Sequence, residues 1–143
     1  MWIEGSRPLS NMVLPDDDYL IAQVHSYSAM EVDPNMGDTS ANFDYKAETD
    51  ALFKAIRAFT EQTGTPVIIG EVGVSHREPD TVLLPRVKYF FKQAAEHGVP
   101  CLWWEDFFYA EDNSQFWLYN KEKQEWGRPK ILKAIKDAIK SRL

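Results

Sequence analysis

The sequence predicts an α/β fold in which short parallel strands alternate with helices. Three apolar stretches, residues 19–27, 66–73 and 99–104, have the length of strands. Each is followed along the chain by a segment in which apolar residues recur at helical spacing. This repeated order favours parallel strands joined by helical crossovers. With 143 residues, the chain is long enough for one domain with its own core.

The chain is expected to be irregular before the first strand. Residues 1–18 contain two prolines and three consecutive aspartates, although residues 1–3 can be the stub of a further strand. The predicted strand over residues 19–27 is apolar at its start and polar towards its end. Residues 28–44 are rich in Asp, Asn, Gly and Pro and predict a loop. Its aspartates fit a solvated loop better than a cation site; they include Asp33, Asp38 and Asp44.

Two helices are predicted between the strands. The first covers residues 45–62, and Gly64 follows it as a stop signal. The second covers residues 83–97 and is followed by Gly98. The apolar positions assigned to their inner sides are Leu52, Ala55, Ile56 and Phe59 in the first helix, and Val87, Phe90, Phe91, Ala94 and Ala95 in the second.

The strand over residues 66–73, with the sequence PVIIGEVG, is the most informative stretch. Residues 67–70 carry no charge and three of them are β-branched, which predicts a parallel strand buried on both faces. Glu71 then lies at the end of the strand, between Gly70 and Gly73. Because ligand chemistry in parallel α/β folds gathers at the carboxyl ends of strands, Glu71 is a candidate site residue. The alternative is a structural glutamate that caps the next turn or pairs with a surface lysine.

The remainder of the chain predicts a strand, a long loop and a helix. Residues 99–104 form the third strand, and the neighbours of Cys101 indicate a buried thiol. Residues 105–127 are acidic and aromatic and predict a loop. Pro129 is expected to open the last helix, since proline is favoured at a first helical position. Its apolar stripe consists of Ile131, Leu132, Ile135, Ala138 and Ile139. Most aromatic residues of the loop are expected in the core: Phe107, Phe108, Tyr109, Phe116 and Trp117.

Composition argues against several classes of function. The net charge is -6 and Lys and Arg form no block, so we expect no nucleic-acid partner. No apolar run approaches membrane-spanning length, and the first residues lack the pattern of a signal peptide, so we expect no membrane partner and leave the localisation open. The single cysteine excludes an intrachain disulfide, and the spacing of the three histidines predicts no metal site. No glycine-rich phosphate loop occurs, and we expect no cofactor.

All three predicted strands end in side chains that suit carbohydrate chemistry. The first ends in His25 and Tyr27, which are two residues apart and share a face. The second ends in Glu71, and the third in Trp103 and Trp104. A glutamate can attack an anomeric carbon, a tyrosine can hold its carboxylate, and tryptophan can stack on a sugar. Each residue alone is more often structural, but a βα barrel directs all these strand ends into one cleft.

Three segments in order, VHSY, PVIIGEVG and GVPCLWWED, resemble the C-terminal half of glycoside hydrolase family 5, which contains many endo-β-1,4-glucanases. The resemblance implies the last three to four βα units of a (β/α)8 barrel, so that residues 1–143 form a half-barrel. It implies that Glu71 is the nucleophile of retaining cleavage and that His25 and Tyr27 belong to the sixth barrel strand. It also implies that Trp104 lies on the eighth strand.

The chain also departs from the family pattern. Arg86 matches an arginine of the family and receives no catalytic role, whereas Tyr119 and Asn120 stand where the family has an acid–arginine pair. The family's acid/base glutamate follows an asparagine on strand four, and no Asn-Glu pair occurs in this sequence. Retaining cleavage needs two carboxyl groups about 5–5.5 Å apart. Glu105 and Asp106 are near in sequence, but the family does not use that position as the acid.

Half a barrel leaves one sheet face and both sheet edges open to water. A full barrel needs about 250 residues, so we expect a homodimer or higher homo-oligomer in which sheets from two chains meet. Three interpretations remain open: a glycosidase that acts on a β-glucan or cello-oligosaccharide as an assembly, a carbohydrate-binding protein without turnover, and a purely structural half-barrel. Hydrolysis that disappears in Glu71→Gln identifies the first, and binding without turnover that disappears in Trp104→Ala identifies the second.

Overall fold

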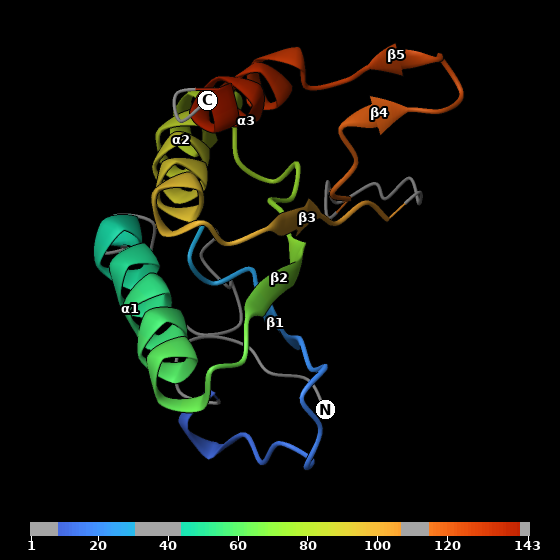
Figure 1. Cartoon of the computed structure of the whole chain (residues 1–143). Helices are drawn as coiled ribbons and strands as arrows, with labels where there is room; N and C mark the ends of the chain where they lie inside the picture. The colour runs from blue at the N-terminus through green and yellow to red at the C-terminus, as the bar shows by residue number, and fades with distance from the viewer. Residues whose placement is uncertain (1–8, 31–43, 107–114, 141–143) are drawn as a thin grey trace.

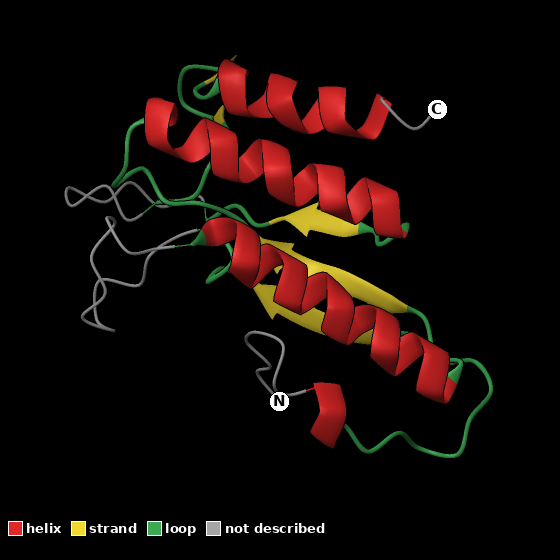
Figure 2. Cartoon of the chain, turned by 90° about the vertical axis from the view of Figure 1, so that its left-hand side faces the viewer, coloured by secondary structure: helices red, strands yellow, loops and turns green. Residues whose placement is uncertain are grey.

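The computed structural model describes residues 9–30, 44–106 and 115–140. Within them, three strands form a sheet, and three helices cover one of its faces (Figure 1, Figure 2). The elements in chain order are η1 (Leu9–Asn11), β1 (Ala22–Ser26), α1 (Tyr45–Thr63), β2 (Val67–Val72), α2 (Asp80–His97), β3 (Cys101–Trp103), β4 (Tyr119–Asn120), β5 (Glu125–Trp126) and α3 (Pro129–Lys140). The strand stub predicted at residues 1–3 lies outside the described residues.

The sheet has the strand order β1-β2-β3, and both strand pairs are parallel. Helix α1 connects β1 to β2, and α2 connects β2 to β3, on the same side of the sheet (Figure 2). The predicted α/β fold with parallel strands is therefore confirmed. In the part of the chain that is described, β1 and β3 are sheet edges, so these three strands do not close into a barrel.

Helix α1 begins and ends at the residues that its caps dictate. The Asp44 carboxylate accepts hydrogen bonds from the backbone N–H groups of Lys46 and Ala47 at 3.1 and 3.0 Å. These bonds satisfy two of the donors that a helix N-terminus leaves open, so Asp44 caps the helix. At the other end, Gly64 adopts a left-handed conformation with φ of 72° and donates to the carbonyl of Thr60. Asp33 and Asp38 lie outside the described residues.

Helix α2 begins at Asp80, three residues before its predicted start. The acidic side chain of Asp80 suits the first turn of a helix, where backbone N–H groups concentrate positive charge. Pro85 lies inside the helix. It lies beyond the first turn, so it removes one backbone hydrogen bond that another residue at this position could donate to the carbonyl four residues earlier. The predicted inner residues Val87, Phe90, Phe91 and Ala94 are buried, and Ala95 is half-buried.

The core lies between the helices and one face of the sheet. Val24, Ile69 and Val72 are fully buried there, and Phe53 of α1 meets Phe90 of α2 edge-on with ring centroids 5.4 Å apart. The opposite face of the sheet is less completely buried, since Ile68 of β2, which lies on it, is only half-buried.

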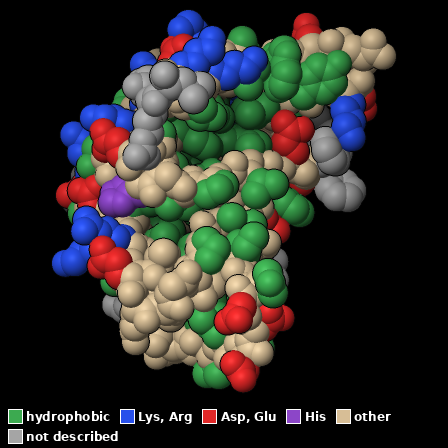
Figure 3. Space-filling model, viewed as in Figure 1, with side chains coloured by type: hydrophobic (Ala, Val, Ile, Leu, Met, Phe, Trp, Pro, Cys, Tyr) green, Lys and Arg blue, Asp and Glu red, His purple; other side chains and the backbone are tan. Residues whose placement is uncertain are grey.

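The prediction that this strand is buried on both faces is therefore wrong. No layer in the described part of the chain packs on the second face of the sheet (Figure 2). Large apolar side chains consequently remain exposed there, among them Ile21, just before β1, at 63% and Leu102 of β3 at 53%. Figure 3 shows hydrophobic side chains at the surface over the middle of the molecule, while Lys and Arg gather at its left and upper margins.

The segment predicted as one long loop, residues 105–127, contains an antiparallel hairpin. Strands β4 and β5 pair Tyr119 with Trp126 and Asn120 with Glu125. Two-residue strands are too short to leave an alternating pattern in the sequence, which is why the hairpin was not predicted. The aromatic residues 107–109 lie outside the described residues.

Helix α3 begins at Pro129, as predicted, and packs along α2 (Figure 1). Ile131 and Ala134 form its buried contact, whereas Ile139 is half exposed. Ala134 was not among the predicted stripe residues. Within the described ranges, the helices are either too short or too polar to span a membrane.

Candidate active site

An extra residue in β2 decides where Glu71 points. Ile69 pairs with Val24, but the next residue of β1, His25, pairs with Glu71, so Gly70 has no counterpart. On the other side of β2, the step from Ile69 to Val72 matches only two residues of β3. Strict alternation would put Glu71 on the same face as Ile69, in the helix-covered core. The bulge instead returns Val72 to the core and leaves Glu71 on the open face.

Glu71 meets two side chains of the first strand on that open face. The hydroxyl of Tyr27 donates a hydrogen bond to Oε2 of Glu71 at 2.8 Å. Nδ1 of His25 lies 3.3 Å from the same oxygen, without the alignment of a hydrogen bond. The side chains of His25 and Glu71 are each 17% exposed. The structure thus brings together the three residues that the sequence proposed as catalytic.

The two neighbours of Glu71 are themselves held in place. The amide nitrogen of Gln23 lies 3.0 Å from Nε2 of His25, and both residues lie on the face that alternation assigns to Tyr27. The ring of Tyr27 meets that of Phe116 edge-on, with centroids 5.4 Å apart. Phe116 is one of the aromatic residues of which most were expected in the core; it is half-buried, and its ring contacts the tyrosine that binds Glu71.

The two candidate tryptophans lie on opposite sides of the sheet. The ring of Trp103 stacks with Phe91 of α2 at 6.3 Å, and its indole N–H donates to the carbonyl of Phe116 at 3.1 Å. Trp103 is therefore engaged on the helix-covered side. Trp104 follows it, donates its backbone N–H to the carbonyl of Val72 and is 41% exposed. Alternation puts its side chain on the open side, the side on which Glu71 lies.

The two acids that follow Trp104 hold the backbone of the next segment. Oε1 of Glu105 accepts from the N–H groups of Leu118 and Tyr119 at 3.0 and 3.3 Å. Oδ1 of Asp106 accepts from the N–H of Phe116 at 2.7 Å. These contacts give both carboxylates a structural role at the base of the β4–β5 hairpin. They anchor the segment that carries Phe116 beside Tyr27.

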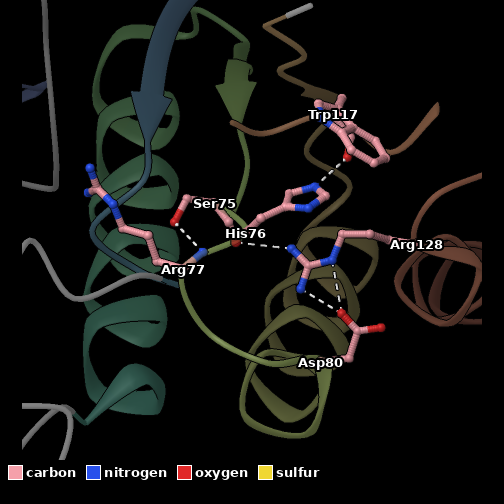
Figure 4. A network of polar contacts seen from close by, with 6 residues as sticks. All are labelled: Ser75, His76, Arg77, Asp80, Trp117 and Arg128. Atoms are coloured by element: carbon pink, nitrogen blue, oxygen red, sulfur yellow. Dashed lines mark hydrogen bonds and ion pairs between the residues drawn. The ribbon is translucent and has the colours of Figure 1, made fainter. Parts of the chain in front are cut away.

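A second polar network fixes the loop after β2 (Figure 4). Arg128, which is buried, reaches the carboxylate of Asp80 at 2.5 Å and the carbonyl of Ser75 at 3.0 Å. Nε2 of His76 lies 2.8 Å from the carbonyl of Trp117, which can only accept, so this nitrogen carries the proton. Burial lowers the pKa of His76 below its ordinary value, and the positive charge of Arg128 acts in the same direction. The network ties the loop that follows Glu71 to the segment before α3.

Other candidates for chemistry are accounted for by packing. Arg86 is buried and contacts Glu78 at 2.5 Å and the carbonyl of Met30, consistent with a structural role. Burial raises the pKa of the Cys101 thiol to about 12, so it carries no thiolate at neutral pH. No group of three His, Cys, Asp or Glu side chains in the described ranges is arranged to hold a metal ion.

The arrangement has one clear chemical capacity. Tyr27 donates to Oε2 of Glu71 and Nδ1 of His25 lies beside the same oxygen, which orients the carboxylate so that its other oxygen can attack a carbon centre. Sequence reasoning missed two contributors to this geometry. Gln23 could have been found from its spacing, since it precedes His25 by two residues and shares its face. The bulge at Gly70 left no sequence signal beyond the glycine itself.

Comparison with known proteins identifies the family to which the chain belongs. The sequence model of "Cellulase (glycosyl hydrolase family 5)" matches residues 3–106. The chain is 30% identical to Endoglucanase A of Clostridium longisporum over 141 residues, which are 94% of this chain and 26% of that protein. It is also 30% identical over 140 residues to Endoglucanase B of Neocallimastix patriciarum, of which it covers 30%.

A solved structure with a similar fold is a GH5-4 broad specificity endoglucanase from Clostridium longisporum. It matches with a TM-score of 0.79 and 25% identity over 94% of this chain and 40% of that one. A GH5-4 endoglucanase from Ruminococcus champanellensis with bound cellotriose matches with a TM-score of 0.75 and 24% identity over 92% and 39%. The chain thus spans about a quarter to two fifths of these relatives. The family match over most of its length shows that the chain belongs to glycosyl hydrolase family 5.

Proposed function

We propose that this chain carries the nucleophile half of a retaining glycoside hydrolase that cleaves β-1,4-glucans, with Glu71 as the nucleophile. The observation that supports the proposal most directly is the contact of one carboxylate oxygen of Glu71 with both Tyr27 and His25. A carboxylate held in this way on an open strand tip is suited to nucleophilic attack. Family membership supports the reaction class.

The reaction proceeds in two displacements. Oε1 of Glu71 forms a bond to the anomeric carbon while the glycosidic C–O bond breaks and its electron pair leaves with the departing oxygen, which takes up a proton. Water then attacks the same carbon, loses a proton, and Glu71 leaves as a carboxylate. Tyr27 and His25 hold Oε2, so the carboxylate keeps one orientation in both steps.

The proton for the first step has to come from outside the residues described. Glu105 and Asp106 already accept backbone hydrogen bonds, and the sequence contains no Asn-Glu pair. Chemistry on natural glucans therefore needs a complementing acid. We propose that a second copy of the chain covers the open face, on which Ile21 and Leu102 are exposed, and that sheets from two chains meet there.

The side chains on the open face also indicate the class of substrate. Trp104 is exposed at the tip of β3 and can stack on a sugar ring, and a relative has been solved with cellotriose bound. We therefore propose that a β-1,4-linked glucan chain lies across the strand tips, with Trp104 as the platform beside Glu71. Trp103 has no part in this platform, because its ring packs against Phe91.

The nucleophile can be tested without the missing acid. A 2,4-dinitrophenyl 2-deoxy-2-fluoro-cellobioside has a leaving group that departs without protonation, so the nucleophile alone determines whether a glycosyl–enzyme ester forms. We expect a covalent mass increase on the wild-type chain, located by peptide mapping at Glu71. Glu71→Gln should show none, and Tyr27→Phe should react more slowly. Labelling at another residue, or equal labelling of Glu71→Gln, would refute the assignment.

Assembly is tested separately by sedimentation velocity at micromolar concentration. We expect a dimer or larger species, and Leu102→Lys should shift it towards monomer because a charge is costly to bury at an apolar contact. A wild-type monomer at this concentration contradicts the second copy.

A binding protein without turnover is the second candidate, favoured because Glu105 and Asp106 are both occupied. It predicts cello-oligosaccharide binding that Trp104→Ala abolishes, together with no labelling of Glu71.

A further inference from the structure

The side chain of Gln23, from β1, lies against Gly70 at the bulge of β2. A Cβ atom placed on Gly70 would lie 2.3 Å from Cδ of Gln23, far inside contact distance. The Gln23 side chain therefore occupies the space that glycine leaves open. From there its amide nitrogen reaches Nε2 of His25 at 3.0 Å. Gly70 thus provides both the extra residue of the bulge and the room for this contact.

The contact determines where His25 carries its proton. An amide nitrogen can only donate, so Nε2 of a neutral His25 has to be the acceptor, and the proton then resides on Nδ1. Nδ1 is the atom that lies 3.3 Å from Oε2 of Glu71. With the proton there, the positive end of the N–H bond lies beside the carboxylate oxygen at this distance; without it, a nitrogen lone pair would lie beside a negative oxygen. If the amide of Gln23 is turned over, its oxygen accepts from Nε2, and a favourable contact with Glu71 then requires both nitrogens protonated.

We infer that Gln23 is a positioning residue that keeps the proton of His25 on Nδ1, towards Glu71, and that Gly70 is required for it to do so. Gln23 does not touch Glu71 and acts only through His25. Its importance for catalysis rests on the proposed nucleophile role of Glu71, but the proton position itself does not. The two can therefore fail separately.

The proton position can be measured by 15N NMR of the histidine ring nitrogens at neutral pH in the whole chain. His76 is an internal reference, because its Nε2 faces the carbonyl of Trp117 and has to be protonated. We expect His25 and His76 to show opposite tautomers in the wild-type protein. Histidine signals are assigned from single His→Gln variants.

Three variants test whether Gln23 determines the position of the His25 proton, and a fourth is the control. Gln23→Leu keeps the approximate size but removes the donor, and one neutral hydrogen bond corresponds to about a fivefold change in the tautomer ratio, towards Nε2–H. Gly70→Ala should act in the same way by displacing the flexible end of Gln23. Gln23→Glu offers only acceptors and should put a proton on Nε2. Gln93→Leu, on the exposed side of α2 where the amide contacts Glu96, is the matched control and should leave His25 unchanged.

Either of two results overturns the inference: a wild-type His25 with its proton on Nε2 alone, or a Gln23→Leu spectrum that matches Gln93→Leu at His25 in a folded protein. Absence of a trapped glycosyl–enzyme with the expected His25 tautomer would instead contradict the nucleophile proposal and leave the role of Gln23 intact.

Discussion

The two faces of the sheet differ in how completely this chain packs them. On the helix-covered face, Val24, Ile69 and Val72 are fully buried beneath α1 and α2. On the open face, apolar side chains such as Leu102 remain exposed, and the polar group around Glu71 lies at the carboxyl ends of the strands. One face provides the packed core, and the other carries the residues that we propose for catalysis.

The difference shows that the described residues suffice to pack the helix-covered face but leave the open face without a covering layer. The helix side already has caps, a continuous apolar core and the ion pair between buried Arg128 and half-buried Asp80. The open side has a positioned carboxylate and lacks a covering layer among the residues described. Substitutions on the two faces should therefore change the unfolding free energy by very different amounts.

The largest effect is expected for Phe53→Ala. Phe53 has no exposed surface and contacts Phe90 and His97 through its ring. Loss of such a side chain leaves a cavity that costs about 3–5 kcal/mol of unfolding free energy. Urea denaturation followed by far-UV circular dichroism measures it. A loss below about 1 kcal/mol would mean that the helix side is not a packed core.

Arg128→Ala should have the next largest effect. It leaves the carbonyl of Ser75 and the carboxylate of Asp80 without their partner, and we expect about 2–3 kcal/mol because Asp80 is partly solvated. Lys133→Ala is the matched control on α3, since its ion pair with Asp137 is exposed and should contribute nothing measurable. Equal effects of the two variants in urea denaturation would show that burial is not the decisive difference.

A smaller effect is expected from acidification. Burial lowers the folded-state pKa of His76, so the unfolded chain binds a proton at a higher pH than the folded one. The stabilisation is complete above the ordinary pKa of histidine and decreases as the pH falls from there towards the lowered folded value. Near His76 lie Arg128, Asp80 and Asp106, which also act on its charge. Urea denaturation at several pH values should show a shallower decrease for His76→Gln; equal slopes contradict the assignment.

The smallest effect on intrachain stability is expected for Leu102→Ala. The side chain is 53% exposed, so its loss should change the unfolding free energy of the monomeric chain by no more than about 0.5 kcal/mol. The measurement is urea denaturation at a dilution where sedimentation finds a single copy. A large loss under these conditions would erase the contrast between the two faces.

The sequence predicted the elements well because their signals are local. Periodicity and end residues such as Gly64 and Gly98 located α1 and α2, and strand ends located His25, Tyr27 and Glu71. Contacts between distant segments left weaker signals. Neither the Trp103 contact with Phe91 nor the anchoring of residues 118–119 by Glu105 follows from residue type or spacing. The burial of β2 was overestimated because an uncharged run does not reveal whether both covering layers are present.

The unmatched residue at position 70 makes the direction of Glu71 depend on how the strand passes through this one position. If the strand ran through Gly70 without a bulge, Glu71 would turn towards α1 and α2 and Val72 towards the open face. Deleting Gly70 has a different consequence, because Ile69, Glu71 and Val72 then alternate regularly opposite Val24, His25 and Ser26, and Glu71 keeps its face. A homologue one residue shorter at this place can therefore direct the same carboxylate to the same face without a bulge.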